Sequence, residues 1–85
     1  NIVWLNLSGA NLSDKDIDFV SQCINIEKLR LENNPLSDSI CNQLVTLNHL
    51  EAVNLNDTRV TEKGIAILQK NQGIKRIYNW HSTTK

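Results

Sequence analysis

Residues whose types and spacing could do chemistry are few in this chain. Asp14, Asp16 and Asp18 stand at alternate positions, as the first ligands of a calcium-binding loop do. Such a loop also needs a glycine at its sixth position and a glutamate at its twelfth, where this chain has Phe19 and Asn25. We therefore interpret the three aspartates as acids at the start of a helix, where the helix dipole favours them, and expect no metal site.

The remaining candidate side chains are isolated. His49 and His81 have no partners at useful spacing, and no serine, histidine and aspartate can be placed on one face for nucleophilic catalysis. The chain has three glycines and no glycine-rich phosphate-binding loop. We expect no catalytic residue, no cofactor and no enzymatic activity in these 85 residues.

Composition and charge exclude further classes. A chain of 85 residues, 40% of them hydrophobic, suits one small globular domain or part of one. Its net charge of zero gives no general attraction to nucleic acid, and no apolar run approaches the ~20 residues that span a bilayer. We expect neither nucleic-acid binding nor membrane insertion by this segment. The excess of bases in residues 61–85 leaves contact with an anionic membrane or nucleic acid as an alternative.

The elements that must position any site follow from an internal repeat of 24 residues. Apolar residues recur at this spacing in several columns, of which the first is Ile2, Ile26, Leu50 and Ile74. Within a copy, an alternating stretch around Leu5 predicts a half-buried strand, and three-residue spacing after Ile17 predicts a helix of roughly three turns. Ser13, Ser37 and Thr61 are the expected N-caps of these helices. Strands joined through such helices are parallel.

The second copy resembles a known pattern. It reads Ile26-x-x-Leu29-x-Leu31-x-x-Asn34-x-Leu36, which is similar to the leucine-rich repeat, and the likeness covers residues 2–84. The resemblance implies an α/β leucine-rich repeat solenoid, with parallel strands on its concave side and helices on its convex side. We expect full repeats at 2–25, 26–49 and 50–73 and a partial C-terminal repeat at 74–85.

A narrower resemblance is to bacterial repeats of the form L-x-L-x-G-T-x-V-T-D-x-G-L. The stretches 5–14 and 53–62 match it, and 77–84 is similar to an ending that follows a membrane segment and a cytochrome-c-like domain in some bacterial proteins. This resemblance implies a larger, bacterial parent protein at the cell envelope. The chain itself has no Cys-x-x-Cys-His haem motif.

The two ends of the repeat array differ in sequence. Asn79 and Thr84 replace core aliphatics in the fourth copy, as suits the polar end of a solenoid. The first strand begins abruptly at Val3 with no capping segment, and an unprotected edge strand invites pairing. We therefore expect the chain to be a fragment, with more repeats or another domain before Asn1.

The two cysteines, Cys23 and Cys41, match no metal-ligand spacing. In the repeat alignment they lie about six residues apart along neighbouring helices, ~9 Å, whereas a disulfide needs Cα atoms within about 7 Å. We expect two buried free thiols.

The predicted binding site is the concave face, since extended concave faces are the usual binding surfaces of solenoids. Strand side chains between the core positions face this side, and aromatic residues and arginine are enriched at interface hot spots. The predicted site residues are Trp4, Asn6, Lys28, Arg30, Glu32, Asn54, Asn56, Arg76, Tyr78 and Trp80.

The predicted function is that of a protein–protein interaction module in a larger bacterial protein, with an unidentified protein partner. Two alternatives stay open. One is that the strand residues are ordinary solvated side chains, with Trp4 and Trp80 covering the ends of the sheet. The other is a purely structural segment that packs against a neighbouring redox or membrane domain of the same chain.

Overall fold

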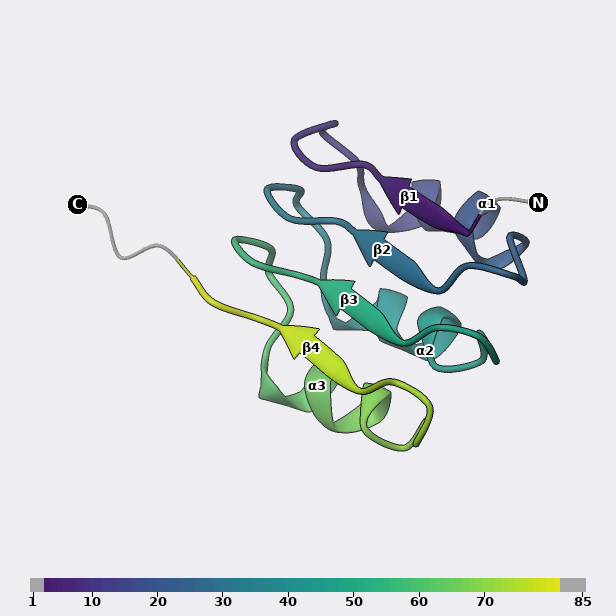
Figure 1. The fold of residues 1–85 in the computed structure, drawn as a ribbon. Helices are drawn as coiled ribbons and strands as arrows, with labels where there is room; N and C mark the ends of the chain where they lie inside the picture. The colour runs from purple at the N-terminus through teal and green to yellow at the C-terminus, as the bar shows by residue number, and fades with distance from the viewer. Residues whose placement is uncertain (1–2, 82–85) are drawn as a thin grey trace.

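The structure is a computed structural model that describes residues 3–81. Four short strands, β1 (Trp4–Asn6), β2 (Lys28–Arg30), β3 (Ala52–Asn54) and β4 (Arg76–Tyr78), form one sheet in the order β1-β2-β3-β4. All neighbouring strands are parallel, and they lie side by side in chain order (Figure 1). The predicted α/β solenoid fold is confirmed.

The register of the sheet follows the repeat of the sequence. Each strand residue pairs with the residue 24 positions further on, so that Leu5 pairs with Leu29, Leu29 with Val53, and Val53 with Ile77. In every strand this central side chain is more buried than its two neighbours. Alternate side chains point to opposite faces of a strand, so the flanking positions are left on the other face of the sheet.

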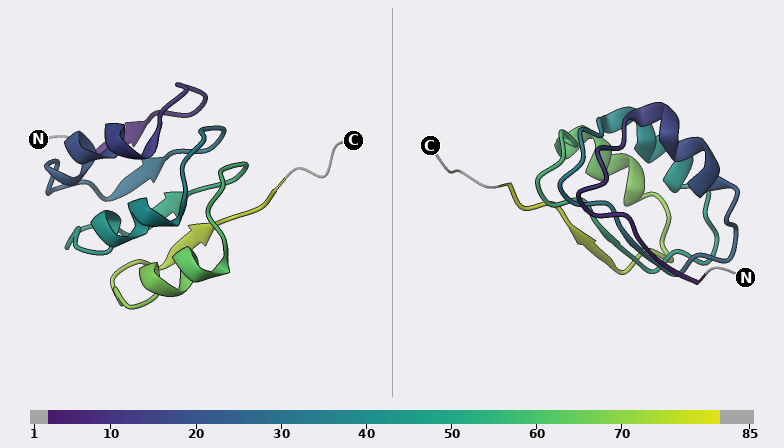
Figure 2. Two further views of the ribbon diagram at one scale, coloured as in Figure 1. Left: turned by 180° about the vertical axis from the view of Figure 1, so that it is seen from behind. Right: turned by 90° about the horizontal axis from the view of Figure 1, so that it is seen from above.

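Helical segments cover one face of the sheet, as the view from above shows (Figure 2). The central side chains of the strands pack with them in one hydrophobic core. The helical segments are η1 (Asp14–Ile17) with α1 (Asp18–Ser21), η2 (Asp38–Ile40) with α2 (Cys41–Leu44), and α3 (Glu62–Leu68). The prediction of helices of about three turns was wrong, because the longest helical run is the eight residues from Asp14 to Ser21. A unit of 24 residues must also hold a strand and two connections, which leaves few residues for the helix. Because a 3₁₀ segment rises further per residue than an α-helix, fewer residues are needed to cover the same length of the sheet.

The core lies between the strands and the helical segments. Leu29, Leu31, Ile40, Leu44 and Val53, all from the second and third copies, are among the residues with at most 1% of their surface exposed. The corresponding strand residues of the outer copies, Leu5, Leu7 and Ile77, are only partly buried, since each has a neighbouring repeat on one side only. Asn79 is partly buried, while Ile2 and Thr84 lie outside the described residues.

The helix starts lie where the sequence predicts them, and the aspartates that follow two of the N-caps also bind the next repeat. Ser13, Ser37 and Thr61 are the N-cap residues. The carboxylate of Asp14 accepts a hydrogen bond from the Ser37 backbone N–H at 2.7 Å, and that of Asp38 accepts one from the Thr61 N–H at 2.6 Å. Each aspartate therefore binds the cap of the following repeat and ties two repeats together.

These contacts also set the acidity of both carboxyls. Burial raises the pKa of Asp14, but the side-chain and backbone hydrogen bonds from Ser37 outweigh it, so the pKa lies below its usual value. For Asp38, the hydrogen bonds from Thr61 are the largest influence, and they also hold the pKa below its usual value.

A second link between repeats is the buried side chain of Asn34. Its Nδ2 donates to the carbonyl of Leu31 in its own repeat at 3.0 Å and to that of Leu7 in the preceding one at 2.9 Å. Its Oδ1 accepts from the backbone N–H groups of Ala10 at 3.1 Å and Leu12 at 2.9 Å. A single amide thus satisfies backbone groups of two adjacent turns, as a buried polar group must.

Both cysteines are free thiols, as predicted. Cys41 is fully buried, whereas Cys23 is only partly buried, so the prediction of two buried thiols holds for one of them. The difference follows from position, because Cys23 lies just beyond the end of α1 in the outermost repeat.

Candidate binding surface on the concave face

The register arranges the concave side chains in rows that run across the sheet. The first row is Trp4, Lys28, Ala52 and Arg76, and the second is Asn6, Arg30, Asn54 and Tyr78. A third row, just beyond the strands, holds Ser8, Glu32, Asn56 and Trp80, which recur at the same 24-residue spacing.

The first two rows surround a hollow of about 430 Å³. All eight of their side chains line it, and the edges of Leu5, Leu29 and Val53 complete the lining. Trp4 and Tyr78, at opposite edges of the sheet, are 70% and 48% exposed. The hollow is within the size range of pockets that hold small ligands or side chains of a partner.

The hollow brings together seven of the ten predicted site residues: Trp4, Asn6, Lys28, Arg30, Asn54, Arg76 and Tyr78. Glu32, Asn56 and Trp80 belong to the third row and do not line it. Trp80 is 64% exposed beside it. The sequence pattern treated all three rows alike, whereas the hollow is confined to the strands themselves.

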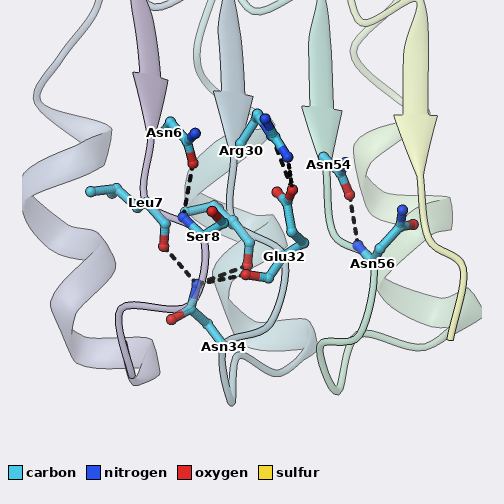
Figure 3. Close-up of polar contacts among 9 residues, drawn as sticks. Asn6, Leu7, Ser8, Arg30, Glu32, Asn34, Asn54 and Asn56 are labelled. Atoms are coloured by element: carbon cyan, nitrogen blue, oxygen red, sulfur yellow. Dashed lines mark hydrogen bonds and ion pairs between the residues drawn. The ribbon is translucent and has the colours of Figure 1, made fainter. Parts of the chain in front are cut away.

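Glu32, predicted as a binding residue of the concave face, has only 7% of its surface exposed. Its Oε2 accepts a hydrogen bond from Nε of Arg30 at 3.0 Å and a second from Nη2 of the same guanidinium (Figure 3). Burial raises the pKa of Glu32, but the hydrogen bond from Arg30, a backbone hydrogen bond and the charge of Arg30 together outweigh it and lower the pKa below its usual value. Glu32 therefore acts as the partner of Arg30 rather than as a free acid of the face.

The asparagines of the face use their oxygen atoms to hold the backbone. Oδ1 of Asn6 accepts from the Ser8 N–H at 3.0 Å, and Oδ1 of Asn54 accepts from the Asn56 N–H at 2.9 Å (Figure 3). Oδ1 of Asn56 in turn accepts from the Trp80 N–H at 2.6 Å. Asparagine commonly bonds the backbone two residues on, so asparagine at positions 6 and 54 was itself the signal for this role.

The cations of the face differ in their partners. Nζ of Lys28 lies 4.6 Å from the centroid of the Trp4 ring, a cation–π contact. Arg30 is paired with Glu32, which is the only ion pair within residues 3–81. Arg76 has no carboxylate partner in that part of the chain. Ala52 lies between Lys28 and Arg76 in the first row, and its small side chain leaves space in the hollow between these two long side chains.

Other kinds of site do not form in the part of the chain that the structure describes. Within residues 3–81, no group of three or more His, Cys, Asp or Glu side chains lies close enough to hold a metal ion. Of the three aspartates considered for calcium, Asp14 bonds Ser37, while Asp16 accepts from the Ser13 N–H at 2.8 Å. No helix among the same residues has the length and apolar character needed to cross a membrane.

Comparison with known proteins supports the reading of the repeat. Residues 25–47 match the family model of the Leucine Rich Repeat. The matched stretch contains β2, η2 and α2, with Lys28, Arg30 and Glu32 of the concave face. Comparisons with curated proteins and with solved structures gave no significant match.

Proposed function

Because the chain contains a leucine-rich repeat, we propose that it is a protein-interaction module that binds its partner through the concave face. Leucine-rich repeats generally serve as protein-binding modules, and solenoids generally bind on extended concave surfaces. The observation that carries the proposal is the hollow, which is lined by four consecutive repeats and gathers exposed aromatic and cationic side chains from the first, second and fourth. Tyrosine, tryptophan and arginine are the residues that contribute most to binding at interfaces.

The proposed role of the concave face is binding and not catalysis. Leucine-rich repeats are generally not enzymes, and the polar groups of the hollow are amides, cations and the Tyr78 hydroxyl, with no carboxylate or histidine among them. The likeness of 5–14 and 53–62 to bacterial repeats supports, as part of the same proposal, a bacterial parent protein. The likeness of 77–84 to an ending that follows a membrane segment supports its place at the cell envelope.

A second candidate function is packing against a neighbouring domain. It is favoured by Phe19 and Ile24 in the first repeat, which are 47% and 66% exposed. Gln43, one repeat after Phe19, reaches back to Asp18 through its Nε2 at 3.0 Å. By the same register, Phe19 lies on the side of the first repeat that faces away from the second, where another domain can cover it.

Selection from a random peptide library on the immobilised chain tests both candidates. The concave variant combines Arg76→Ser with Tyr78→Ser, and its matched control combines Lys70→Ser with Ile24→Ser, so each loses one cation and one exposed apolar side chain. Proton–nitrogen NMR spectra first establish that both variants keep the fold.

We expect the selected peptides to bind the control as tightly as the parent chain and to lose at least about tenfold in affinity for the concave variant. If the selected peptides bind the concave variant with the same affinity as the parent chain, the concave site is contradicted. If the same peptides instead fail on the control, the packing surface near Ile24 is the better candidate.

A further inference from the structure

We propose that the concave hollow recognises an acidic, extended peptide segment, with one carboxylate of the peptide above Ala52, between Lys28 and Arg76. This inference rests on the proposed function and specifies the chemistry of its partner. It is drawn from the charge, the hydrogen-bonding groups and the row structure of the hollow.

Charge is the first argument. The lining of the hollow includes Lys28, Arg30 and Arg76, and it contains no aspartate or glutamate. Glu32 neutralises Arg30 from outside the hollow, whereas no carboxylate within residues 3–81 pairs with Lys28 or Arg76. The chain as a whole has zero net charge, so this local excess of positive charge comes from the arrangement of the rows and not from the composition.

The two cations without a carboxylate partner come from the same row of the hollow. Lys28 and Arg76 lie in the same row on β2 and β4, with Ala52 of β3 between them. Neighbouring strands are about 4.8 Å apart, so the two backbones are separated by about 10 Å, which long side chains can bridge from both sides to one carboxylate. The ammonium group of Lys28 lies 4.6 Å from the centroid of the ring of Trp4, which pairs with Lys28 from β1, whereas Ala52 pairs with it from β3, so a carboxylate above Ala52 competes with this ring for the ammonium group.

The hydrogen-bonding groups of the hollow also favour an acidic ligand. Oδ1 of Asn6 and Oδ1 of Asn54 already accept backbone hydrogen bonds, so their Nδ2 groups are the parts left to face a ligand. With the ammonium and guanidinium groups, the rim of the hollow offers donors in excess of acceptors. A matching ligand must be rich in acceptors, as the carboxylates and backbone carbonyls of an acidic peptide are.

The same features favour a peptide over a nucleic acid. Two uncompensated cations suit one or two carboxylates, whereas nucleic-acid affinity depends on neutralising a run of phosphates with many cations. Trp4 and Tyr78 at the two edges of the sheet provide apolar contacts for the side chains that flank an acid in an extended segment. The partner is therefore expected to cross the strands with acidic and apolar side chains in alternation.

NMR titration of the isotope-labelled chain with a six-residue oligoglutamate tests the inference, with a six-residue oligoglutamine as the uncharged control. We expect shifts at Lys28, Ala52 and Arg76 with oligoglutamate and none with oligoglutamine. Ala52→Glu places a carboxylate of the chain itself in the hollow and should abolish binding. Arg76→Gln should raise the Kd about three- to fivefold, whereas Lys70→Gln, which removes one charge on the opposite side, should leave it unchanged.

Three results would overturn the inference: oligoglutamine binding as well as oligoglutamate, Lys70→Gln weakening binding as much as Arg76→Gln, or an oligothymidylate of equal charge binding equally well at the same residues. The third result assigns the hollow to phosphates. Failure of this inference is distinguishable from failure of the proposed function. If library peptides without acidic residues bind and still depend on Tyr78, the concave binding site is supported and only its specificity for acidic peptides is refuted.

Discussion

Replacing Asn34 by threonine should loosen the first repeat from the second. Thr58 stands 24 residues after Asn34 and shows what threonine can do at this position. Its Oγ1 donates to the carbonyl of Leu55 at 2.8 Å and accepts from the N–H of Val60, both in its own repeat. Asn34→Thr should therefore keep the bond to Leu31 within the repeat. It should lose the 3.2 Å bond to the Glu32 carbonyl and the three bonds to Leu7, Ala10 and Leu12 in the preceding repeat.

The expected cost follows mainly from the three hydrogen bonds lost to the preceding repeat. Each net contribution is about 1 kcal/mol, and the groups left behind are only partly buried, so water can satisfy some of them. We expect the free energy of unfolding to fall by about 2–3 kcal/mol. In a solenoid each repeat contacts only its neighbours, so the loss should be concentrated in the first repeat.

Urea unfolding followed by circular dichroism measures the total, and amide hydrogen exchange locates it. The amides of Ala10 and Leu12 should lose protection, while that of Leu55, which bonds the carbonyl of Tyr78, should keep it. Asn42→Thr is the matched control, because the exposed Asn42 side chain makes one marginal bond of 3.5 Å. Unchanged protection at Ala10 and Leu12, or an equal loss of stability in the control, would refute the reasoning.

The remaining predictions concern the links between repeats and the thiols. Gly64→Ala should destabilise the chain by about 1–3 kcal/mol despite better helix propensity, because the new Cβ would lie 2.5 Å from Oδ1 of Asp38 and 2.9 Å from Sγ of Cys41; a thermal melt no lower than that of the parent would contradict this. The pKa values of Asp14 and Asp38 lie below the usual 3.8, so their stabilising effect is present above that pH and is lost as the pH falls through the folded values. Unfolding at about pH 5.5 and about pH 2.5 should show a smaller difference for Asp14→Asn and Asp38→Asn together than for the parent chain, and an equal difference would disprove the assignment. Burial, with the charges of Asp38 and Asp14, raises the pKa of Cys41 to about 12, so iodoacetamide should label Cys23 first in the native chain, as mass spectrometry of the peptides can show.

The sequence alone determined the architecture. The 24-residue spacing of apolar side chains imposes a parallel register, because only that register buries every column at once, and all three pairs of strands follow it. The helix starts at Ser13, Ser37 and Thr61 were equally predictable, since capping depends on residues within one turn. Helix length was not, because it depends on how much of each repeat the two connections consume.

The sequence predicted which face of the sheet carries the site, but not which contacts the side chains of that face make. Alternation along each strand identifies which side chains leave the core, and seven of the ten that were named line the hollow. Which of them are free to bind depends on neighbours that only the folded chain supplies. Glu32 is withdrawn into a contact with Arg30, and Asn54 gives its oxygen to the backbone of Asn56.

The same division holds for the links between repeats. Asp14 and Ser37 are 23 residues apart, and Asn34 and Leu7 are 27 apart. Local sequence rules assign such side chains to their own helix or turn, because propensity and capping act over a few residues. Their actual partners were decided by stacking, which places the same turn of successive repeats within hydrogen-bonding distance. Repetition in the sequence thus determined the fold, and contact between the repeats decided which side chains hold it together and which remain to bind a partner.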